Sequence, residues 1–199
     1  MALTSSTEAG GALDTAERMA LLRIARAAIG DGLSGARPRA LELDQYAAAL
    51  RAPAATFVTL ELYGELRGCV GTLEAFQPIV VDTAENAYAA AYRDPRFPAL
   101  CASEFERLDI HISVLSPPEP LAFTSEQDLI RQLRPGIDGL ILRERSRCGT
   151  FLPAVWDSVA DPREFLRHLK IKAGLLPDYW SDALVVSRYT ALLIGDGFA

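Results

Sequence analysis

Residues 56–71 read TFVTLELYGELRGCVG and predict the β-hairpin from which the rest of the fold can be interpreted. Apolar and polar or small side chains alternate on both sides of Tyr63-Gly64-Glu65, which is the period of half-buried strands. A register slip of one residue would turn every side chain to the other face, so the two apolar faces coincide only across an odd-numbered loop. We therefore predict a three-residue loop at 63–65. The resulting pairs are Leu62 with Leu66, Glu61 with Arg67, Leu60 with Gly68 and Thr59 with Cys69.

This register places Arg67 and Cys69 on the less apolar face of one strand, with their Cβ atoms about 6–7 Å apart. A guanidinium that approaches a sulfur favours the thiolate, which is the nucleophilic form of cysteine. Gly68 and Gly71 carry no side chain, so a ligand or another backbone can approach closely there. The segment thus predicts a site in which Cys69 is the catalytic nucleophile or redox thiol and Arg67 anchors an anionic small molecule.

A purely structural interpretation of the same residues stays open. Arg67 could pair with Glu61 across the strands, a contact worth about 0.2–1 kcal/mol. A free cysteine is also among the most buried residue types and commonly packs as a small hydrophobe.

Length and charge limit the classes of protein to consider. A chain of 199 residues can form one good-sized core or two small lobes. Half of the residues are hydrophobic and 23% are charged, which is typical of a globular protein. The net charge of −6 argues against nucleic acid as a partner, because a phosphate-binding surface needs a basic excess.

The cysteines and the N-terminal residues indicate a compartment. Three cysteines lie far apart without a CxxC pair, so we predict neither a disulfide framework nor a metal site, and no motif calls for a cofactor. Residues 1–11 lack the apolar region of a signal peptide, and no apolar run is long enough to cross a bilayer. We expect a cytoplasmic protein with no membrane association.

The rest of the chain predicts a mixture of helices and strands. Residues 1–13 are expected to be a mobile tail, followed by one domain at 14–199 that begins with a capping box at Asp14 and Glu17. The order helix, hairpin, helix, strand occurs twice, which suggests two pseudo-repeated halves. The expected elements after the tail are helices at 14–29, 79–92, 126–133 and 162–173, strands at 108–115 and 184–194, and a second hairpin within 138–152.

Three further places carry polar candidates. Asp94 and Arg96 lie in a proline-bracketed turn, where an Asp that accepts backbone hydrogen bonds and an Arg that pairs on the surface are the simpler interpretation. His111 lies on the polar side of its strand, where an acid–base role competes with a cross-strand contact. Lys170 and Lys172 lie in the last turn of a helix, where they complement its dipole.

Six motifs in a fixed order make the chain resemble the AMMECR1 family, also described as component A of the AmmeMemoRadiSam system. The similarity runs from about Thr56 to Ala173. The motifs are LRGCVG at 66–71, DPRFP at 94–98, ISVLS at 112–116, GIDGL at 136–140, FLP at 151–153 and KAG at 172–174. Family members commonly carry Gln or Glu where this chain has Ala154, so any role of that side chain is absent here or is taken by another group.

The resemblance implies an α+β fold in which two pseudo-repeated halves share a mainly antiparallel, barrel-like sheet flanked by helices. It implies a pathway shared with MEMO-like and radical-SAM proteins, without an established activity. For an enzyme, we expect Cys69 to be catalytic and a cleft to be completed by the substrate-binding residues Arg67, Gly68, Gly71, Asp94, Arg96 and Lys172. The alternative is a non-catalytic adaptor whose glycine-lined face binds a protein or ligand.

Overall fold

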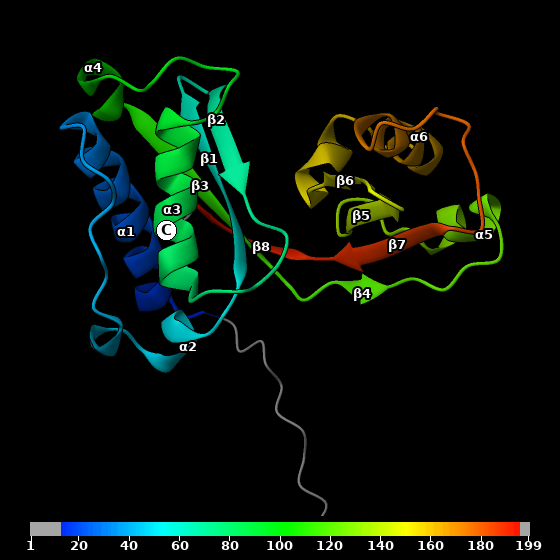
Figure 1. The fold of residues 1–199 in the computed structure, drawn as a ribbon, viewed down its shortest axis with the longest axis horizontal. Coiled ribbons are helices and arrows are strands. Elements are labelled where there is room, and N and C mark those ends of the chain that lie inside the picture. The colour runs from blue at the N-terminus through cyan, green and yellow to red at the C-terminus, as the bar shows by residue number, and fades with distance from the viewer. Residues whose placement is uncertain (1–12, 196–199) are drawn as a thin grey trace, which may run out of the picture. The chain divides into compact units, whose positions relative to one another are not determined.

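The computed structural model describes residues 13–195, which form two compact units (Figure 1). Unit 1 comprises residues 13–115 and 192–195, and unit 2 comprises residues 116–191. Each unit has its own sheet, helices and hydrophobic core. Residues 1–12 of the expected N-terminal tail lie outside the described residues. Leu13, the last residue of that tail, is buried in the core of unit 1.

Unit 1 is a four-stranded antiparallel sheet in the order β2-β1-β3-β8, with α3 packed on β1 and α1 packed on α3. Its elements are α1 (Thr15–Leu33), η1 (Leu43–Gln45), α2 (Ala48–Arg51), β1 (Ala55–Leu62), β2 (Glu65–Gly71), α3 (Ile79–Tyr92), α4 (Ala102–Phe105), β3 (Leu108–Leu115) and β8 (Ala191–Gly195).

The start of α1 is the predicted capping box, in which the Asp14 and Glu17 side chains each accept the other residue's backbone N–H. The helix continues past Ile29, its predicted end, to Leu33. Gly32 explains this extension: a Cβ there would lie 2.1 Å from the Tyr92 ring, so the glycine lets α1 and α3 approach closely. Tertiary packing outweighs the roughly 1 kcal/mol that a glycine costs inside a helix.

The first hairpin has a different register near its turn from the predicted one. Thr59 pairs with Cys69 and Leu60 with Gly68, as predicted, but beyond Leu60 the register shifts at a β-bulge. The turn contains two residues, Tyr63 (φ 57°) and Gly64 (φ 78°). Such left-handed pairs match the twist of the flanking strands, and the bulge restores the register that an even-numbered loop would break.

The bulge changes the direction of Leu66 and Arg67, so their predicted faces are wrong. The observed pairs are Glu61 with Leu66 and Leu62 with Glu65, which leaves Arg67 as the extra residue. Leu66, expected on the apolar face, is 45% exposed, whereas Arg67 is only 8% exposed.

Unit 2 is a four-stranded antiparallel sheet in the order β4-β7-β5-β6, with α6 against β6 and α5 against α6. The ring of Phe165 stacks on Trp156 at a centroid distance of 3.7 Å in its core. Its elements are β4 (Glu119–Pro120), α5 (Glu126–Gln132), β5 (Gly139–Glu144), β6 (Arg147–Phe151), η2 (Pro153–Asp157), α6 (Pro162–Lys172) and β7 (Leu184–Tyr189).

The antiparallel α+β class is confirmed, but one sheet shared by two halves is not what forms. Each unit has a separate sheet, and within residues 13–195 no closed barrel is present. The expected strand at 184–194 is two strands, since β7 joins unit 2 and β8 joins unit 1. Both units contain a hairpin, a helix and a strand that returns to the hairpin's first strand, but the pseudo-repeat stays a prediction.

No helix within residues 13–195 combines the length and the hydropathy that crossing a membrane requires.

Candidate functional site

The peptide units of Cys69 are held by the turn that follows α3. β2 is an edge strand, and the Cys69 N–H donates to Asp94 Oδ2 at 2.9 Å, while Arg96 Nη2 donates to the Cys69 carbonyl at 3.3 Å. Arg96 also binds Asp94 with its Nε and Nη2 atoms at 2.9 and 2.6 Å. These side chains satisfy edge groups that would otherwise be open to another strand.

Electrostatics reinforce these contacts of Asp94 and Arg96 with the Cys69 backbone, which we call the clamp. The Arg96 guanidinium holds the pKa of Asp94 well below its usual range, and the Cys69 and Arg96 N–H groups lower it further against the opposing effect of burial. The Asp94 side chain is 3% exposed and that of Arg96 is 53% exposed. Asp94 is therefore a buried carboxylate with its charge neutralised, and Arg96 presents the accessible part of the pair.

The Cys69 side chain lies half-buried on the face of the sheet opposite α3, because the neighbouring Gly68 faces α3. The Thr59 hydroxyl lies 3.4 Å from the Cys69 sulfur. Thr59 pairs with Cys69 on one side and with His111 on the other, so these three residues form a row across β2, β1 and β3. His111 Nε2 lies 3.6 Å from Glu61 Oε2. One face thus carries a thiol, a hydroxyl, an imidazole and a carboxylate.

Arg67 does not lie beside Cys69 as predicted. Its Nε and Nη2 donate to the two carboxylate oxygens of Glu104 at 2.8 and 3.0 Å, and Nη2 also donates to the Pro98 carbonyl at 3.0 Å. The Arg67 hydrogen bond lowers the pKa of Glu104 from 4.5 to about 2. The guanidinium is committed to this buried contact with α4, so it is not placed to anchor an anion at Cys69.

At Gly68 and Gly71, the space that a side chain would occupy is taken by other parts of the protein. A Cβ on Gly68 would lie 2.2 Å from the Ala90 carbonyl oxygen of α3, and one on Gly71 would lie 2.3 Å from the Phe57 ring. The backbone approach expected at Gly68 is therefore that of α3. Neither glycine leaves room for a ligand on the side where its side chain would point.

Lys172, the lysine predicted to bind substrate, lies in unit 2. Lys172 lies in α6 of unit 2, with its ammonium 5.1 Å from the centre of the Phe151 ring, whereas the other predicted site residues lie in unit 1. Lys170 is wholly buried and pairs with Glu126 at 2.5 Å, so it holds α5 against α6 and does not only complement the helix dipole. Ala154 is exposed in η2.

Sequence reasoning missed a buried polar network at the start of α3. Asp82, which is 0% exposed, accepts hydrogen bonds from the Thr56 N–H at 2.8 Å, the Thr72 hydroxyl at 2.8 Å and the Asn86 amide at 2.9 Å. Asp82 and Asn86 are four residues apart on the buried side of α3, which is otherwise mostly apolar. A polar pair at that spacing was the available signal.

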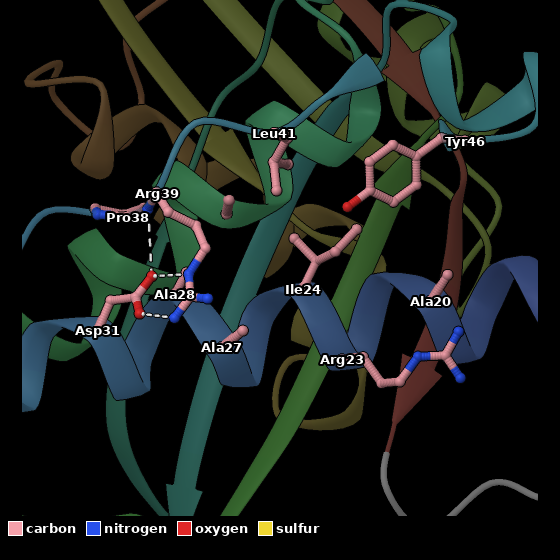
Figure 2. A pocket seen from close by; sticks show the side chains of 11 residues that line it. Ala20, Arg23, Ile24, Ala27, Ala28, Asp31, Pro38, Arg39, Leu41 and Tyr46 are labelled. Carbon is pink, nitrogen blue, oxygen red and sulfur yellow. Dashed lines mark hydrogen bonds and ion pairs between the residues drawn. The ribbon is translucent and has the colours of Figure 1, made fainter. Parts of the chain in front are cut away.

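Two cavities of unit 1 lie against α1 and α3, and Cys69 lines neither of them. They measure about 310 and 460 Å³. Figure 2 shows the first, with side chains of α1 and of the segment at 38–46 around it. Within residues 13–195, no group of three His, Cys, Asp or Glu side chains is placed to bind a metal ion.

Comparison with known proteins gives a consistent result. Residues 22–194 match the model of the AMMECR1 family. A protein of Methanothermobacter thermautotrophicus is 40% identical over 83% of this chain and 86% of its own length, and Protein MJ0810 of Methanocaldococcus jannaschii is 33% identical over 85% of each chain. The crystal structure of the uncharacterized protein PH0010 from Pyrococcus horikoshii superposes with a TM-score of 0.80, at 34% identity and with 87% and 88% of the two chains covered.

The family model spans both units, and these relatives exceed 30% identity over most of their length. The chain therefore belongs to the AMMECR1 family.

Proposed function

We propose that the chain is a small-molecule enzyme whose nucleophile is the Cys69 thiol, with His111 as the acid–base group. The observation that carries the proposal is the row of Cys69, Thr59 and His111 across three adjacent strands. Cysteine catalysis needs a sulfur in a constant position and a group that exchanges protons near neutral pH. A clamped strand and an imidazole meet these two needs.

The clamp supports the first need. Because Asp94 and Arg96 bind both the N–H and the carbonyl of Cys69, its backbone has little freedom to move. Preorganisation of this kind is what a reacting group requires, since small displacements cost large factors in rate. Asp94 then acts as a positioning residue.

The spacing of the row indicates the size of the substrate. Directly opposed residues on antiparallel strands have Cα atoms about 4.5 or 5.5 Å apart, so Cys69 and His111 are separated by about 10 Å. The imidazole is too far away to touch the sulfur, but a substrate lying over Thr59 would reach both groups. Arg96, which is about half exposed beside Cys69, takes the anion-anchoring role first predicted for Arg67.

The family resemblance adds a context to this proposal, namely a reaction in a pathway with MEMO-like and radical-SAM proteins. The alternative is a non-catalytic adaptor with a glycine-lined docking face. It loses its main support because Ala90 and Phe57 occupy the space beside Gly68 and Gly71 that a partner would need.

The proposal is tested by thiol labelling in a Cys101→Ser/Cys148→Ser background, in which Cys69 is the only cysteine. We expect iodoacetamide to label Cys69 faster than it labels free glutathione at neutral pH. Thr59→Val should slow this labelling several-fold, because it removes the hydroxyl that lies 3.4 Å from the sulfur, while Ser113→Ala, which lies opposite Phe57 on β3, should leave it unchanged. Labelling no faster than that of glutathione, or equal rates in all variants, would reject the nucleophile.

A further inference from the structure

Two cavities of unit 1 share part of their wall, a segment that we call the strap and define as residues 37–41. Pro38, Arg39 and Leu41 of the strap line both cavities, the first against α1 and the second against α3. Figure 2 shows Pro38, Arg39 and Leu41 of the strap beside α1, with Arg39 in an ion pair with Asp31 of that helix. The Asp31 carboxylate accepts from the backbone N–H of Arg39 as well as from its guanidinium. The cavities therefore have one wall in common that is tied to α1.

The second cavity is basic in a protein that is acidic. Arg37, Arg39 and Arg93 line it, together with the single carboxylate of Glu85. Arg39 is already neutralised by Asp31, and Glu85 accepts a hydrogen bond from Gln77. Within residues 13–195, no carboxylate pairs with Arg37 or Arg93. Two guanidinium groups without counter-charges at one cavity, in a chain of net charge −6, favour an anionic ligand.

The remaining walls suit an organic body. Tyr88 lines the second cavity, and the Arg93 guanidinium lies 5.2 Å from the centre of its ring. Val81, Ala84 and Ala89 supply small apolar surface. The volume, about 460 Å³, is within the usual range of roughly 300–1,000 Å³ for small-molecule sites.

Asn86 adds a directional acceptor. Asn86 is 5% exposed and lines the second cavity. Its amide nitrogen donates to the Asp82 carboxylate and to the Thr56 carbonyl. Those two acceptors determine which end of the amide is the nitrogen. The carbonyl end makes no hydrogen bond within residues 13–195, so it can accept one from a ligand.

We infer that the cavity between the strap and α3 binds a small organic anion. Its phosphate or carboxylate group is bound by Arg37 and Arg93, and its ring or apolar body lies against Tyr88 and the alanines of α3. Arg favours both oxyanions through the same forked hydrogen bonds. The site is separate from Cys69, which does not line it, so it stands or falls independently of the proposed enzyme activity.

The test is calorimetric titration of the full chain with phenyl phosphate and with benzoate, which share a ring and differ in the oxyanion. We expect saturable binding of at least one of them, with a dissociation constant about tenfold higher for Arg37→Gln and for Arg93→Gln. Both arginines are exposed, so these variants should fold normally. Arg51→Gln, an exposed arginine of α2 that lines neither cavity, is the matched control and should bind as the unmodified chain does.

The two ligands decide the oxyanion, because preference for phenyl phosphate indicates a phosphate ester and preference for benzoate indicates a carboxylic acid. Absence of saturable binding of both ligands at millimolar concentration would overturn the inference. Equal weakening by the Arg51 control would overturn it as well, because only general surface charge would then be at work.

Discussion

At the scale of single residues, Arg67 and Cys69 show where sequence reasoning ends. The pairing of Cys69 with Thr59 could be predicted because it depends only on alternation and on the nearest apolar pairs. The partner of Arg67 could not, since Glu104 is 37 residues away and only the bulge turns the guanidinium toward it. A buried ion pair with a distant partner leaves no periodic signal in the sequence.

The Arg67–Glu104 pair gives a prediction for stability in acid. The pKa of Glu104 is lowered from 4.5 to about 2, so its contribution is present above pH 4.5 and is lost as the pH falls to 2. We expect Glu104→Gln to reduce the free energy of unfolding by about 2–3 kcal/mol at pH 7, and the difference to vanish near pH 2. Urea unfolding at several pH values measures it.

The control for this prediction is Glu106→Gln, an exposed carboxylate of the same segment without an ion pair in residues 13–195. Its effect should be within about 0.5 kcal/mol at every pH. A Glu104 variant whose deficit stays constant from pH 7 to pH 2 would contradict the assigned pKa shift.

At the scale of elements, the hairpin shows how turn chemistry can change a register predicted from periodicity. Alternation alone favours an odd-numbered loop, but Tyr63 and Gly64 both adopt left-handed backbone angles and close a two-residue turn. The bulge opposite Leu60 then compensates. Alternation of apolar and polar residues does not reveal a bulge residue, which has no partner on the neighbouring strand. The two-residue turn with a bulge could therefore not be predicted in place of the three-residue loop.

Replacement of glycine by alanine is expected to have opposite effects on the stability of unit 1 at Gly68 and at Gly30. Gly68→Ala would place a Cβ 2.2 Å from the Ala90 backbone oxygen, so β2 and α3 must separate, and we expect a loss of about 2 kcal/mol or more. Gly30→Ala would place a Cβ 3.5 Å from Phe105 within α1, and we expect a gain of up to about 1 kcal/mol. Thermal unfolding of both variants measures the pair. Equal shifts in the same direction would contradict this packing of α3 on β2.

At the scale of the whole molecule, the sequence predicted the class of fold and most helices but not the division into two sheets. The doubled order of elements suggested halves that contribute to one sheet, whereas each unit completes its own. Residues 184–194 contain no glycine or proline, yet one strand ends at Tyr189 and a strand of the other sheet begins at Ala191. Which sheet a strand joins depends on how it packs against the core of each unit. The alternation of residues within one strand carries no information about that packing.

Two separate cores predict that the units lose their structure independently. Phe165, in unit 2, and Ile110, in unit 1, are both 0% exposed. We expect Phe165→Ala, which should cost about 3–5 kcal/mol, to accelerate amide hydrogen exchange in unit 2 and to leave unit 1 protected. Ile110→Ala should do the reverse. Mass spectrometry of peptides from each unit reports this, and equal acceleration in both units would show one cooperative core instead.

The central claim, that Cys69 is a reactive thiol, is tested most directly by letting the three cysteines compete within the unmodified protein. Cys101 and Cys148 are exposed and Cys69 is half-buried, so accessibility alone would label Cys69 last. With less than one equivalent of iodoacetamide at neutral pH, followed by peptide mass spectrometry, we predict that Cys69 is alkylated first. Labelling of Cys101 and Cys148 ahead of Cys69 would contradict the account and leave its thiol a packing residue of the sheet.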